Sequence, residues 1–187
     1  MEKLPYRKTK RLKGFNYSES GFYFITICTN GFKHYFGEVK NQYMFLNEAG
    51  CMLYRNWENL EKEFESVIPQ EFIVMPNHIH GIIELRNGEI GTDNHPTASF
   101  DREGHRKGHP YTEVNKTLGD VVGAFKSRTT GEYIKMVKNK LCLPFPGKLW
   151  QKNYYERIID NEKDYDNIAE YIIYNPNQWL KGSDKYG

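Results

Sequence analysis

Cysteine is scarce in this 187-residue chain, and long apolar runs are absent. The three cysteines, Cys28, Cys51 and Cys142, are far apart and form no Cys-x-x-Cys pair, so neither a disulfide framework nor a zinc knuckle is predicted. The lack of a long apolar run argues against a membrane span, and residues 1–8 lack the apolar core of a secretory signal. We therefore expect a cytoplasmic protein without a membrane partner.

Charge of one sign is also in short supply, because the net charge is only +2. Such a value does not by itself indicate a polyanionic partner. Hydrophobic content of 39% and charged content of 27% are typical of a globular protein, and the length suits one domain. We expect a single domain over residues 1–187, in which the polar, glycine-containing stretch 86–110 is a mobile loop insertion.

Hydrophobic periodicity and turn residues predict an alternation of strands and helices. The expected elements are strands at 23–29 and 34–39, a helix at 47–60, a strand at 72–85, a helix at 117–136, an extended segment at 147–159 and a helix at 161–174. Asn30-Gly31 predicts a hairpin turn, and Pro76 predicts an interruption within its strand. The expected fold class is α+β, with a ferredoxin-like antiparallel sheet and helices packed on one face.

Two histidines, His78 and His80, lie in the apolar strand expected at 72–85. Residues two apart in an extended chain project from the same face, about 6.5 to 7 Å apart along the strand. The imidazoles should therefore point to one side while Ile79 points to the core. Such a pair can hold one divalent ion, but two buried histidines with ordinary hydrogen bonds would give the same pattern.

Five segments together resemble the HUH single-tyrosine transposases, and especially the REP-associated tyrosine transposases. These segments are 47–50, 72–83, 123–127, 149–159 and 170–176, and the second contains Met-Pro-Asn-His-Ile-His-Gly. The resemblance covers most of the chain outside the 86–110 loop. It implies cleavage of single-stranded DNA by a tyrosine hydroxyl, which leaves a 5′-phosphotyrosine linkage and a free 3′-hydroxyl.

The resemblance also implies site residues. In this family the His-hydrophobic-His pair binds Mg²⁺ or Mn²⁺, and the last helix carries both a third ligand and the nucleophile. By position within 170–176, the nucleophile falls on Tyr171 and the third ligand on Asn175, beside His78 and His80. Residues four apart are neighbours on one helix face, so one helix can present both groups. This set of ligands would not exclude zinc.

Alternatives remain open for these residues. Tyr171 can also be explained as a core tyrosine, and Asn175 as a residue that Pro176 forces out of the helix. The rival nucleophiles are Tyr154, Tyr155 and, as an outsider, Tyr174.

Four cations are candidates for contacts with DNA phosphates, although exposed cations are ordinary on any protein surface. They are Lys126, Arg128, Lys152 and Arg157.

The first hypothesis is a metal-dependent single-stranded DNA endonuclease and strand transferase that acts on single-stranded or hairpin DNA in DNA transposition. The second is a binding module whose exposed aromatics in segment 21–27 stack bases without cutting. Dependence on a metal separates the two. A third, a replication or mobilisation nickase of the same superfamily, has less support because no helicase or accessory domain is expected here. The sequence does not choose between a monomer and a homodimer with exchanged tyrosine helices.

Overall fold

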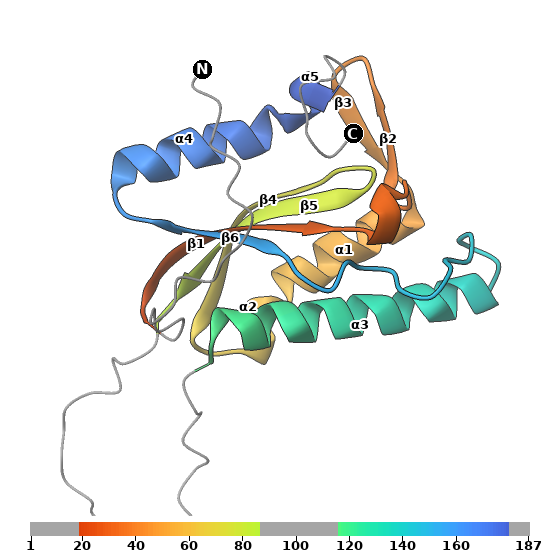
Figure 1. Cartoon of the computed structure of the whole chain (residues 1–187), viewed down its shortest axis with the longest axis horizontal. Coiled ribbons are helices and arrows are strands. Elements are labelled where there is room, and N and C mark those ends of the chain that lie inside the picture. Colours follow the sequence, from red (N-terminus) through yellow and green to blue (C-terminus); the bar gives the residue numbers. More distant parts are fainter. Residues whose placement is uncertain (1–18, 87–115, 180–187) are drawn as a thin grey trace, which may run out of the picture.

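A computed structural model describes residues 19–86 and 116–179 of the chain (Figure 1). The strands are β1 (Gly21–Cys28), β2 (Gly37–Lys40), β3 (Tyr43–Leu46), β4 (Val67–Val74), β5 (His78–Leu85) and β6 (Tyr155–Ile159). The helices are α1 (Glu48–Glu58), α2 (Leu60–Glu63), α3 (Leu118–Lys138), α4 (Glu162–Ile173), α5 (Asn175–Trp179) and the short 3₁₀ helix η1 (Asn30–Phe32).

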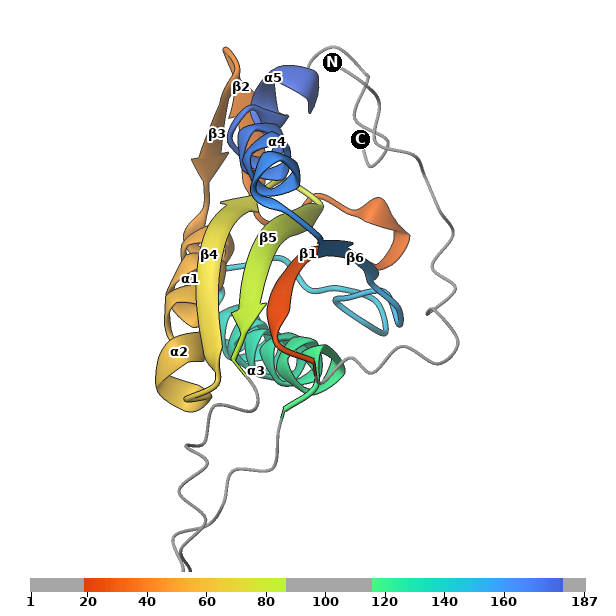
Figure 2. The same ribbon diagram turned by 90° about the vertical axis from the view of Figure 1, so that its left-hand side faces the viewer.

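Four strands form one antiparallel sheet in the order β4-β5-β1-β6, and β2 pairs only with β3 (Figure 2). Without the β2–β3 hairpin, the chain runs β1-α1-β4-β5-α3-β6, which is the βαββαβ order of ferredoxin-like proteins. The predicted fold class, an α+β protein with helices packed on an antiparallel sheet, is confirmed.

Helices cover both faces of this sheet, whereas the sequence suggested one covered face. Helices α1 and α3 lie against one face, and α4 crosses the other (Figure 1). The cause is visible in β1, where alternate residues enter two separate apolar clusters: Ile25 and Ile27 pack toward α1 and α3, and Phe24 packs toward α4. We call these the core face and the α4 face.

Local hydrogen bonds explain where the helices begin. Asn47 caps α1 and Asn161 caps α4, each through its side-chain oxygen. Thr117 and Asp120 form a reciprocal capping box at the start of α3. The three predicted helix starts are therefore confirmed.

Two predictions about the strands are wrong in part. The strand at 23–29 does not form a hairpin with 34–39, because β1 pairs with β5 and β6 instead. The backbone N–H groups of Tyr35 and Phe36 donate to the carbonyl of Pro76, which ties this segment to a distant turn. The stretch 72–85 is two strands, and the predicted interruption at Pro76 is the reversal between β4 and β5.

Within the described ranges, no helix is both long and apolar enough to cross a membrane. The loop insertion expected at 86–110 lies, except for Arg86, within the stretch 87–115, which is outside the described residues.

Candidate active site

The two histidines lie side by side at the start of β5, on the α4 face. Both His78 and His80 are completely buried, and their Nε2 atoms are 3.1 Å apart. Ile79 points the opposite way and joins the core-face cluster. The predicted placement of both imidazoles on one side of the strand is confirmed.

Burial controls the charge of this pair. It lowers the pKa of His80 to about 3. It also holds the pKa of His78 well below the ordinary value, with smaller contributions from the nearby His80 and His34. Both imidazoles are therefore neutral near pH 7, the form in which histidine binds metal ions.

Two neighbours orient the rings. The side-chain oxygen of Asn77 lies 2.7 Å from Nδ1 of His78, and because an amide oxygen only accepts, that Nδ1 carries the proton. The Thr26 hydroxyl lies 2.8 Å from Nδ1 of His80 and can accept its proton in the same way. With Nδ1 protonated on both rings, the two Nε2 atoms, 3.1 Å apart, are the atoms through which both imidazoles would bind one cation.

Helix α4 places Tyr171 beside this pair. Its hydroxyl oxygen is 3.4 Å from Nε2 of His80, and the two ring centroids are 5.2 Å apart. The apolar side chains of Ile168 and Ile172 hold α4 on the sheet, in the same cluster as Phe24. Tyr171, predicted from the sequence as the nucleophile, is thus brought to the histidines within one chain.

Asn175 begins α5, directly after α4, and is completely buried. Neither its side-chain oxygen nor its nitrogen has a hydrogen-bond partner within residues 19–86 and 116–179. Trp179 lies four residues further and packs 6.0 Å from the ring of His78, so both residues lie on the same side of α5. A buried polar group without a partner is costly, by about 1 to 3 kcal/mol, and asks for an explanation.

These donors fit a divalent cation. Two neutral imidazoles face each other, and an amide without a partner belongs to the helix that packs on His78. No cluster of three or more His, Cys, Asp or Glu side chains in the described part of the chain could hold a metal ion. A third protein ligand for an ion bound by His78 and His80 would therefore be of another type, and an amide oxygen such as that of Asn175 has suitable chemistry.

The rival tyrosines are placed differently. Tyr155 lies opposite Thr26 in the sheet, and its ring is 6.1 Å from that of Phe24, so it shares the α4 face with the site. Tyr154 packs against the core-face cluster, and Tyr174 is 48% exposed beyond the end of α4. Tyr155 is therefore the nearer rival to Tyr171.

The four predicted DNA-contacting cations do not form one patch of free charges. Arg128 pairs with Glu63, and Arg157 pairs with Asp164. Lys126 donates to the carbonyls of Gln151 and Lys152, and burial lowers its pKa. Of the four, only Lys152 is exposed, and it forms no ion pair within residues 19–86 and 116–179.

Sequence reasoning missed several neighbours of the site. Thr26 could be found only from the pairing of β1 with β5, where it stands opposite His80. The ring centroids of His34 and Trp179 are 5.4 Å apart, with the planes tilted by 58°, and nothing in the local sequence indicates that contact. Asn77 had a visible signal, because it precedes His78 inside the histidine segment.

The premise of the binding-module hypothesis is wrong. Its aromatics in segment 21–27 were expected on an exposed sheet, but Tyr23 is 1% exposed and Phe24 is 3% exposed. Helices on both faces bury these two rings, and the half-buried Phe22 packs edge-on against Tyr165 of α4.

Sequence comparison with known proteins finds a clear relative of this chain. It is 40% identical to an uncharacterised protein of Haemophilus influenzae strain Rd over 176 residues, which cover 94% of this chain and 91% of that protein. The chain belongs to the same family as this protein. No protein-family model matches the chain.

The fold of the present chain resembles that of a transposase whose structure has been solved. A REP-associated tyrosine transposase bound to a REP hairpin superposes with a TM-score of 0.52 at 16% identity, over 86% of this chain and 69% of that one. At this identity the likeness establishes a shared fold. A candidate transposase from Deinococcus radiodurans R1 gives a TM-score of 0.41 at 15% identity, over 88% of this chain and 96% of that one, which is too low to support an argument.

Proposed function

We propose that the chain is a metal-dependent endonuclease and strand transferase for single-stranded DNA that acts through a 5′-phosphotyrosine intermediate in DNA transposition. The observation that carries this proposal is the position of the Tyr171 hydroxyl, 3.4 Å from Nε2 of His80 in a buried histidine pair. A nucleophile and a potential cation site thus meet on one face of the sheet. The fold shared with a tyrosine transposase supports the same conclusion.

In the proposed reaction, the Tyr171 oxygen attacks the scissile phosphorus and forms a new P–O bond. The bond from phosphorus to the 3′ oxygen breaks, the phenol proton passes to water, and the departing oxygen takes up a proton. The DNA 5′ end remains on the tyrosine, and the 3′-hydroxyl is free. Because one phosphodiester replaces another, a 3′-hydroxyl can reverse the reaction without an energy source.

His78, His80 and Asn175 would hold Mg²⁺ or Mn²⁺. Such a cation, when bound, neutralises charge on the phosphoryl oxygens in the transition state. The protein's part is positioning: Asn77 and Thr26 fix the two imidazoles, and the packing of α4 holds the phenol near its line of attack.

Single-stranded or hairpin DNA is the proposed partner. The solved transposase of the same fold was bound to a REP hairpin, which supports this choice. Lys152 is the best placed of the four predicted cations for a phosphate contact, since it is exposed and forms no ion pair with the residues that the structure describes. Tyr171 and the histidine pair come from one chain, so we propose that a single copy can cleave and that a homodimer is not required for the chemistry.

The test is covalent capture of labelled single-stranded DNA in Mn²⁺ or Mg²⁺, followed by a denaturing gel. Tyr171→Phe should abolish the adduct while DNA binding persists. Tyr165→Phe is the matched control, because Tyr165 lies on the same helix but donates its hydroxyl to Glu71. Undiminished adduct from Tyr171→Phe would reassign the nucleophile, first to Tyr155. Adduct formation that continues in a chelator would contradict the metal dependence, and DNA binding without any adduct would favour a binding module.

A further inference from the structure

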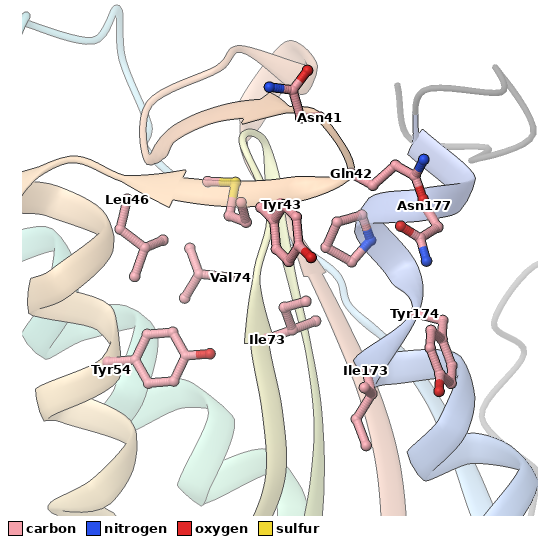
Figure 3. A pocket seen from close by; sticks show the side chains of 12 residues that line it. Asn41, Gln42, Tyr43, Leu46, Tyr54, Ile73, Val74, Ile173, Tyr174 and Asn177 are labelled. Atoms are coloured by element: carbon pink, nitrogen blue, oxygen red, sulfur yellow. The ribbon is translucent and has the colours of Figure 1, made fainter.

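A cavity of about 500 Å³ adjoins the candidate active site, between the β2–β3 hairpin, the edge strand β4 and the end of α4 (Figure 3). Its floor includes Ile73, the cross-strand partner of His80, so the floor lies about 4.8 Å, one strand, from the histidine pair. Its wall includes Tyr174, which follows Tyr171 by about 4.5 Å along the helix axis. The cavity therefore lies within one strand and one helical turn of the candidate active site.

The lining combines flat rings with amides. Tyr43 reaches from the hairpin toward the floor (Figure 3), and Tyr174 lines the cavity from the end of α4. These two side chains are 71% and 48% exposed. The rim carries three amides, those of Asn41, Gln42 and Asn177, and none of them forms a side-chain hydrogen bond within the described part of the chain.

The backbone at the rim is strained. Asn41 and Gln42 form the two-residue turn between β2 and β3, with φ angles of 50° and 69°. Such a turn favours Asn-Gly, because glycine adopts positive φ without a steric penalty. A glutamine in the glycine position therefore costs conformational energy that nothing else in the hairpin explains.

We propose that this cavity binds one unstacked nucleobase of the DNA strand, next to the scissile linkage. Tyr43 and Tyr174 contact the faces of the base, and the Gln42 amide, a donor and an acceptor, bonds to its edge. This inference rests on the proposed function and adds a base preference to it. A second copy of the chain is the other candidate occupant, but an apolar contact would leave the three rim amides without partners.

Gln42→Gly is the decisive variant, because it creates the favoured Asn-Gly turn and removes the Gln42 side chain with its amide. Wild type and variant are each incubated in EDTA with a pool of randomised single-stranded oligonucleotides, and the bound fraction is sequenced. Wild type should select a motif with one fixed base. In Gln42→Gly, the preference for that base over the other three should fall about tenfold, and the rest of the motif should be unchanged. The thermal unfolding midpoint of the variant should equal or exceed that of wild type.

Two further variants complete the test. Tyr174→Ala, which lies outside the hairpin, should weaken binding of the selected motif about tenfold. Phe45→Ala is the control, since Phe45 is 54% exposed on the same hairpin and does not line the cavity. It should leave both selectivity and affinity unchanged.

The outcomes separate the two proposals. An identical base preference in wild type and Gln42→Gly, or no preference in wild type, overturns the base site even where the Tyr171 adduct forms. If the base preference depends on Gln42 but no covalent adduct forms, the base site is supported and only the proposed cleavage activity is overturned. A dimer that Tyr43→Ala dissociates in sedimentation velocity would assign the cavity to a second copy and overturn the base site.

Discussion

The two faces of the sheet differ in what they bury. On the core face, β1 and β5 contribute only apolar side chains to one large cluster with α1 and α3, in which Trp57 stacks on Phe72 at 4.3 Å. On the α4 face, the same two strands bury Thr26, His78 and His80 beside a small apolar cluster. The core face therefore supplies most of the apolar burial that stabilises the fold, and the α4 face carries polar groups whose burial costs desolvation.

This difference is expected where one scaffold has to support a reactive site. A buried neutral histidine, or a buried amide without a partner, costs stability that apolar packing elsewhere must offset. The α4 face should consequently respond to pH and to polar-to-apolar changes, whereas the core face should respond to changes in volume. Three predictions test this contrast.

Acid should act on the α4 face most strongly. Because burial lowers the pKa of His80 to about 3 and holds that of His78 well below 6.5, the unfolded chain takes up more protons than the folded chain as the pH falls below 6.5. Stability should therefore decrease with falling pH, by about 1.4 kcal/mol per pH unit for His80, and His78 adds to this decrease in the same direction.

The measurement is urea unfolding of the metal-free protein in EDTA between pH 7 and pH 5. The double variant His78→Gln/His80→Gln should give a much flatter dependence over this window. An equally steep dependence in the double variant would show that other groups control acid stability.

A change in volume should act on the core face. A Cβ added to Gly81 would lie 2.4 Å from a ring carbon of Trp57, which is fixed by its stacking on Phe72. Gly81→Ala should therefore lower the free energy of unfolding by about 3 kcal/mol. Gly131→Ala is the matched control: a Cβ there meets nothing within 4 Å, and alanine inside α3 should raise the stability by up to about 1 kcal/mol. Equal effects of the two substitutions in urea unfolding would contradict the packing at Trp57.

Local patterns in the sequence explain which parts of this fold could be predicted. Helix caps such as Asn47 and Thr117 bond to residues three positions away, and the alternation in β5 sets the direction of His78 and His80, so both are visible in a short window. The pairing of β1 with β5 joins residues fifty or more positions apart, and the hydrogen bond between Thr26 and His80 depends on it. A single sequence has no signal for that pairing.

The ion pairs of the predicted cations could not be predicted from the sequence for the same reason. Arg128 and Arg157 are ordinary surface residues in the sequence, and only the folded chain brings them to Glu63 and Asp164. Tyr171 was placed by family resemblance, and the packing of α4 on the sheet supports that placement physically. Asn175 was predicted from the family resemblance, and the structure adds that its amide is buried with no hydrogen-bond partner among the described residues.

The smallest expected effect concerns this amide. Asn175→Leu replaces an unpartnered polar group by an apolar one of similar size, so we expect the metal-free protein to gain about 1 kcal/mol in the free energy of unfolding. The same substitution at Asn56, a buried asparagine of α1 whose amide donates to Met52, removes a hydrogen bond and should lower the stability. If Asn175 is a metal ligand, Asn175→Leu should also reduce the yield of the Mn²⁺-dependent adduct. A loss of stability in both variants would mean that the Asn175 amide is satisfied in solution and would remove the structural support for its role as a ligand.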